Sequence, residues 1–116
     1  MSMIAETELK ITWLLDGWYR GLVSPAEVHH FAEQWMAKIC LVDDIDRSLA
    51  VFEVLSQLDI LNQQLIIRAD IPEMLKFLDY AKTNPSEARD NWNKYWKSVD
   101  FKERAEMLSQ SDFYAC

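Results

Sequence analysis

The chain has 116 residues, half of them apolar, with only two glycines and three prolines. This composition excludes a disordered chain, disfavours a turn-rich all-β fold, and is enough to build one hydrophobic core without a metal or disulfides. The 19 acidic and 12 basic residues give a formal net charge of -7, which disfavours direct binding to DNA or RNA and favours a basic protein partner.

The first predicted element is a helix over residues 4–20, which ends at Gly21. Most of its apolar residues fall on one broad face at 100° per residue, namely Ile4, Ile11, Leu14, Leu15, Trp18 and Leu22. Leu9 and Trp13 fall on nearly the opposite face. Trp13 is therefore either covered by a second helix or exposed as an aromatic anchor for a partner, and both readings stay open.

A second helix is predicted over residues 25–40, and its start is the best-specified feature of the sequence. Ser24-Pro25-Ala26-Glu27 combines an N-cap serine, a proline at the first helical position and a glutamate three residues after the cap. The apolar residues that follow form a single stripe, made of Val28, Phe31, Ala32, Trp35, Met36 and Ile39.

A third helix is predicted over residues 45–58, apolar on two sides, as is usual for a helix central to a bundle. One side carries Ile45, Leu49, Phe52 and Leu55, and the other carries Val51, Val54 and Leu58. Residues 59–69 are open to three interpretations: an extension of this helix, a short helix, or an extended segment at 65–67. The leucine and glutamine content favours helix.

Three further helices are predicted, each behind a capping signal at Asp70-Ile71-Pro72-Glu73, Asn84-Pro85-Ser86-Glu87 or Asp100-Phe101-Lys102-Glu103. The inward residues expected on them are Ile71, Met74, Leu75, Leu78 and Ala81, then Ala88, Trp92, Tyr95, Trp96 and Val99, then Phe101, Ala105 and Leu108. From about residue 110 a frayed tail is expected, in which Phe113 and Tyr114 can still dock. The fold class is therefore all-α, a single-domain bundle of five or six short helices.

No motif for catalysis, cofactor binding or metal binding is evident. Both glycines lie at Gly17 and Gly21, so there is no glycine-rich phosphate loop, and Cys-x-x-Cys, His-Glu-x-x-His and Gly-x-Ser-x-Gly are all missing. Glu27 and His30 have the Glu-x-x-His spacing of di-iron bundles, but such a site needs a second copy of the motif. Asp44-Ile45-Asp46 is missing the glycine and the closing glutamate of a calcium loop. We therefore expect no enzyme activity, no cofactor and no metal.

The sequence also bears on the cellular location of the protein and on the state of its two cysteines. Neither a signal peptide nor a membrane-spanning apolar run is evident. Cys40 and Cys116 lie far apart in the sequence, as incidental thiols in a reducing cytoplasm would. We expect a cytoplasmic protein that does not contact a membrane.

An acidic cluster lies between residues 41 and 59, where five acids face one base, Arg47. The acids are Asp43, Asp44, Asp46, Glu53 and Asp59. Such a cluster is either a solvated face that also caps a helix, or a docking patch that attracts a basic partner over long range.

The stretch Leu14-Leu15-Asp16-Gly17-Trp18-Tyr19-Arg20-Gly21-Leu22-Val23-Ser24-Pro25-Ala26-Glu27-Val28, with Trp35 downstream, resembles the opening of small helical bacterial immunity proteins, the colicin D immunity type among them. The resemblance covers the first 35 to 40 residues. It implies a cytoplasmic antidote of the toxin-immunity or contact-dependent growth inhibition type, which binds a cognate toxin domain, often a basic nuclease, and occludes its active site.

On that reading, the acids of the 43–59 cluster mimic phosphates in the toxin's substrate cleft, and Trp13 or an exposed tail aromatic such as Tyr114 supplies an apolar anchor. We expect a monomer in a 1:1 complex. The alternative is a helical adaptor or regulatory protein that acts through protein–protein contacts, with a homodimer through Leu9 and Trp13 as one arrangement.

Overall fold

The structure, a computed structural model, describes residues 3–39, 50–111 and 113–114 and shows six α-helices in that part of the chain. They are α1 (Met3–Tyr19), α2 (Pro25–Ile39), α3 (Ala50–Asp59), α4 (Ile71–Tyr80), α5 (Pro85–Ser98) and α6 (Phe101–Leu108), with a 3₁₀ turn η1 (Arg68–Asp70) before α4. The described residues contain no strand, and the predicted all-α class is confirmed.

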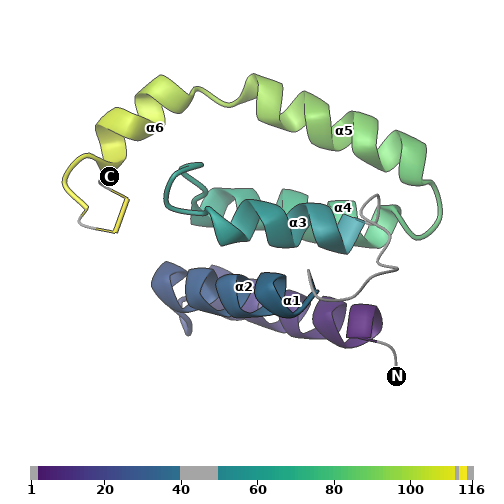
Figure 1. Cartoon of the computed structure of the whole chain (residues 1–116). Helices are drawn as coiled ribbons and strands as arrows, with labels where there is room; N and C mark the ends of the chain where they lie inside the picture. Colours follow the sequence, from purple (N-terminus) through teal and green to yellow (C-terminus); the bar gives the residue numbers. More distant parts are fainter. Residues whose placement is uncertain (1–2, 40–49, 112, 115–116) are drawn as a thin grey trace.

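The helices form three layers (Figure 1). α1 and α2 make one layer, α3 and α4 lie in the middle, and α5 and α6 run across the other side of the middle layer. α1 contacts α2, α3 and α4, whereas α5 packs mainly on α4. The outward side of α1 is therefore left without a helical neighbour among the described elements.

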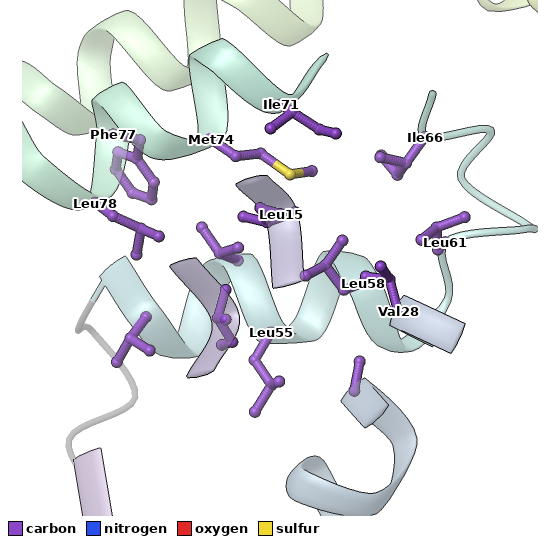
Figure 2. Packing of buried hydrophobic residues seen from close by; sticks show 14 of the residues in the cluster. Leu15, Val28, Leu55, Leu58, Leu61, Ile66, Ile71, Met74, Phe77 and Leu78 are labelled. Carbon is purple, nitrogen blue, oxygen red and sulfur yellow. The ribbon is translucent and has the colours of Figure 1, made fainter. Parts of the chain in front are cut away.

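The core lies between these layers, where α4 directs Ile71, Met74 and Leu78 toward α3 and Leu15 (Figure 2). The buried apolar residues are Ile11, Leu15, Trp18, Val28, Ala32, Trp35, Val51, Val54, Leu55, Leu58, Leu61, Ile66, Ile71, Met74, Phe77, Leu78, Ala88 and Trp92. Phe77 was not among the expected inward residues. It is buried because α5 covers it, with the Trp92 ring stacked 4.4 Å from its own.

The capping chemistry behaves as predicted at three of the four helix starts. Glu27 donates its backbone N–H to Ser24 Oγ at 3.1 Å, and Ser24 donates its own N–H to Glu27 Oε1 at 3.3 Å. Asn84 and Asp100 each accept from the backbone N–H three residues later. These caps satisfy backbone donors that a helix start leaves unpaired.

The prediction for Asp70 is wrong. Its side chain makes no cap hydrogen bond to α4. Instead Asp70 Oδ2 accepts the backbone N–H of Ile67 at 2.8 Å, and the carboxylate is fully buried. The cap was mispredicted because a local pattern does not show Tyr95 and Arg104, which bind this carboxylate from 25 and 34 residues away.

Three other expectations need correction. α3 ends at Asp59, and the residues after it form turns with a positive φ of 55° at Leu65, so the favoured helix over 59–69 is wrong. Leu22 is 78% exposed rather than inward, because it lies in the turn after α1. α6 has no buried residue, and its expected inward Phe101 and Ala105 are both exposed. The part of the third predicted helix before residue 50 lies outside the described residues.

Candidate protein-binding surface

Trp13 lies on the outward side of α1 and is 73% exposed, so the interpretation in which a second helix covers it is wrong. No helix covers it. Leu9, one turn earlier on the same helix, is 60% exposed. An exposed tryptophan next to an exposed leucine forms an apolar spot of the kind found at the centre of protein interfaces.

A hollow of about 520 Å³ lies beside this spot, between α1 and α4. It is lined by Glu8, Leu9, Thr12, Trp13 and Asp16 from α1 and by Leu75 and Lys82 from α4 and the turn after it. The hollow is open to solvent, and its wall combines apolar side chains with carboxylates. Such a surface suits a side chain that has both an apolar stem and a charged end, as arginine and lysine do.

The charged side chains around Trp13 form ion pairs within the chain. Lys82 Nζ lies 3.6 Å from Glu8 Oε1, and Arg20 Nε lies 3.1 Å from Asp16 Oδ2. The side chains of Lys82, Arg20 and Asp16 are 49% to 67% exposed and that of Glu8 is 27% exposed. Each pair therefore contributes little to stability and can exchange for a partner's charge at small cost.

The acidic cluster predicted as a docking patch is only partly within the described residues. Asp43, Asp44 and Asp46 lie outside them. Glu53 is bonded within the molecule, where it accepts from Trp92 Nε1 and Arg89 Nη1, each at 3.2 Å, and so joins α3 to α5. Asp59, at the end of α3, is partly buried.

Tyr114 is also not the exposed tail aromatic that the sequence suggested. It packs against the core together with Phe113, and its hydroxyl donates to the backbone carbonyl of Ile66 at 2.5 Å. The predicted docking of these two rings is therefore confirmed, and of the two anchors proposed from the sequence only Trp13 is exposed.

A buried polar cluster that sequence reasoning missed lies under α5 and α6. Arg104 binds both oxygens of Asp70, with two N–O distances of 2.6 Å, and also donates to the carbonyl of Leu65 at 3.1 Å. Tyr95 donates its hydroxyl to Asp70 Oδ1 at 2.5 Å. In the sequence, this cluster shows only as an acid at a helix start and as an arginine and a tyrosine on later helices. Such a combination is too common to predict a buried polar cluster.

The physical setting of this cluster shifts several pKa values. Burial, and then the hydrogen bond to Asp70, raise the pKa of Tyr95 to about 12. Burial, and then the negative charge of Asp70, raise the pKa of Tyr114 to about 12 as well. Burial lowers the pKa of Arg104, but the hydrogen bonds and charge of Asp70 outweigh it and raise that pKa overall. Tyr95 and Tyr114 therefore stay protonated and Arg104 stays charged, as hydrogen bonds and an ion pair with a structural role require.

His29 is held by two contacts within the chain. Its Nδ1 lies 3.2 Å from the carbonyl oxygen of Leu58, and its Nε2 lies 3.2 Å from Glu33 Oε1. Among the described residues, no three His, Cys, Asp or Glu side chains gather as a metal site would require. None of the described helices has the length and apolar composition needed to cross a bilayer.

No family model, no curated protein and no solved structure matches this chain.

Proposed function

We propose that this protein is an inhibitor of the immunity type, which binds a cognate toxin domain and covers its active site. The exposed Trp13 carries the proposal, because it lies at the edge of a hollow and beside a second exposed apolar residue, Leu9. A tryptophan in such a place costs solubility unless a partner covers it, and tryptophan is enriched among the residues that dominate binding energy.

The chemistry of the surroundings favours a basic partner. The chain carries a formal charge of -7. Two carboxylates, Glu8 and Asp16, line the hollow beside Trp13, where they pair with Lys82 and Arg20 within the chain. A toxin that acts on nucleic acid presents arginine and lysine side chains, whose stems can pack on the indole while their charged ends reach these carboxylates. The adaptor alternative has no observation of its own that favours it over inhibition.

The test of the function is co-expression with the product of the gene directly upstream, followed by size-exclusion chromatography of the purified pair. We expect a stable complex with a basic protein that is lethal when expressed alone. A harmless neighbour that elutes separately would contradict the proposal.

The test of the surface is Trp13→Ala measured in that complex. Truncation of a central tryptophan should weaken toxin binding by about 2 kcal/mol or more, which is roughly 30-fold in Kd. Met107→Ala is the matched control, since Met107 is 61% exposed on α6, far from Trp13 in the sequence. Isothermal titration calorimetry measures both, and equal affinities for the two variants would remove Trp13 from the contact.

A further inference from the structure

The C-terminal arm, which we define as α6 and the described residues after it, is attached to the bundle without burying a helical face. None of the α6 side chains is buried, and no other described helix packs closely along it. The link to α5 is short and extended at Val99. The arm lies at the same end of the molecule as the turn that follows α3 (Figure 1). An element with so little buried apolar surface can open while the rest of the chain stays folded.

The strongest contact of the arm is made to one buried carboxylate. Asp70 is fully buried, and two nitrogens of the Arg104 guanidinium each lie 2.6 Å from one of its oxygens. Arg104 Nη1 also donates to the backbone carbonyl of Leu65 at 3.1 Å. The guanidinium therefore binds three acceptors, an arrangement that suits a planar cation with several N–H donors.

These acceptors are held in place by groups outside the arm. Tyr95, on α5, donates its hydroxyl to Asp70 Oδ1, and the backbone N–H of Ile67 donates to Asp70 Oδ2. Neither hydrogen bond involves α6, so the carboxylate can keep its orientation when the arm lifts. It then loses the cation that Arg104 supplies. A poorly solvated carboxylate without a counter-charge is unfavourable, so the open site favours another cation of the same shape.

Two features at the contact between arm and bundle are unfavourable while the arm is closed. Leu65, whose carbonyl accepts from Arg104, has a φ of 55°, a left-handed conformation that is unfavourable for a residue with a Cβ. Trp96, on which Phe101 stacks with 6.3 Å between ring centroids, has a buried indole N–H with no acceptor among the described residues. Lifting the arm frees the Leu65 carbonyl and opens one side of the Trp96 ring to water, so both costs can be relieved.

We propose that Asp70 and the Leu65 carbonyl form an arginine-binding site, which the arm closes with its own Arg104 and which an arginine of another protein takes when the arm lifts. A lysine fits this site less well, because its ammonium group cannot bind both carboxylate oxygens as a planar guanidinium does. The arm is thus an autoinhibitory strap, since a partner's arginine has to displace Arg104. The inference goes beyond the proposed function: neither Asp70 nor Leu65 lines the hollow beside Trp13, and the tests need no toxin.

Hydrogen exchange of the full chain, followed by mass spectrometry, tests whether the arm lifts. We expect the amides of α6 to exchange about tenfold faster than those of α3 and α4, or more. Arg104→Lys should speed the exchange of α6 by a further factor of about three, because it loses the bidentate contact. Lys102→Met is the matched control at an exposed position of the same helix and should change nothing. Exchange of α6 as slow as that of α3 and α4, or equal effects of the two variants, would refute the strap.

Chemical rescue of Arg104→Ala tests the binding site. Methylguanidinium at low millimolar concentrations should raise the thermal unfolding midpoint of this variant by several degrees, because it binds the folded state. Methylammonium at equal concentration should leave the midpoint unchanged. Arg20→Ala, which loses only an exposed ion pair, should respond to neither cation. If Arg104→Ala does not fold, the same titration is followed as recovery of the helical circular dichroism signal. Rescue by both cations, or by neither, would refute a guanidinium site.

Nα-acetyl-argininamide, which carries peptide groups as an arginine in a protein does, tests the displacement. It should raise the midpoint of Arg104→Ala, and in Arg104→Lys it should speed the exchange of α6, because a ligand in the site holds the arm open. Nα-acetyl-lysinamide should do neither. Rescue by methylguanidinium without any response to Nα-acetyl-argininamide would show a cavity filled behind a closed arm, and would overturn the exchange of Arg104 for a partner's arginine.

Discussion

Asp70 shows how one residue can serve a different purpose from the one its neighbours in sequence suggest. Its carboxylate is fully buried and is neutralised by Arg104, whose side chain is only 11% exposed. The pair also receives hydrogen bonds from Tyr95 and from the backbone of Ile67. Removing one partner from a buried pair leaves an uncompensated charge, which costs far more than the loss of an exposed pair.

Arg104→Met should therefore lower the free energy of unfolding by about 3–5 kcal/mol. Arg104→Lys keeps the charge but loses the bidentate hydrogen bonding, and it should lower the free energy of unfolding by less. Arg20→Met is the control, because its pair with Asp16 is exposed and should contribute no more than about 1 kcal/mol. Urea denaturation measures all three, and equal losses at Arg104 and Arg20 would show that burial of the pair does not matter.

At the scale of the element, α6 is held by polar contacts rather than by a buried apolar face. None of its residues is buried, and its strongest tie to the rest of the molecule is the bidentate bond from Arg104 to Asp70. A stacked contact between Phe101 and Trp96, 6.3 Å between ring centroids, adds to it. The tail after α6 is tied in a similar way by the hydroxyl of Tyr114. The hydrogen bonds that Tyr95 donates to Asp70 and Tyr114 donates to Ile66 exist only while the two hydroxyls are protonated.

Stability should consequently fall at alkaline pH. Tyr95 and Tyr114 have folded-state pKa values of about 12, above the ordinary value of 10. A raised folded pKa means that the folded state holds the proton more tightly, so the contribution is complete below pH 10 and is lost between about pH 10 and 12.

The measurement is the urea midpoint as a function of pH. Tyr95→Phe and Tyr114→Phe should each reduce the alkaline fall, since neither phenylalanine has a proton to lose. Tyr19→Phe is the control, because Tyr19 is exposed at the end of α1. If stability at alkaline pH falls as much in Tyr95→Phe and in Tyr114→Phe as in the unaltered chain, these two hydroxyls are not the cause of the fall.

At the scale of the whole molecule, the excess of negative charge should speed the encounter with a basic toxin. Long-range attraction acts on the association rate and weakens as salt screens it. The residues predicted to contribute most are Asp43, Asp44 and Asp46, on the evidence of their clustering in the sequence.

The variant Asp43→Asn/Asp44→Asn/Asp46→Asn should slow association with the toxin and flatten its dependence on ionic strength, as followed by stopped-flow fluorescence. A control variant with Asp79→Asn, Asp90→Asn and Glu106→Gln removes the same number of charges from exposed positions elsewhere. If the two triple variants associate at the same rate, the 43–46 acids have no special role and only the overall charge counts.

The sequence by itself determined the helices and most of their inner faces. Periodicity and capping are local, so residues three or four apart carry the whole signal, as at Ser24 with Glu27 and Asn84 with Glu87. The same local reading failed where local preference is weak, as in the turns after Asp59, and where a helix buries none of its apolar residues, as at Phe101.

Tertiary structure alone decided which apolar and charged residues face solvent. Trp13 and Trp92 are both helical tryptophans, yet one is 73% exposed and the other 2%, because only α5 has a neighbouring helix against that side. Asp70 and Glu53 look like ordinary acids in the sequence, and each is committed to an arginine 34 or 36 residues away. Contacts at such separation depend on how helices pack, and a local pattern carries no information about that.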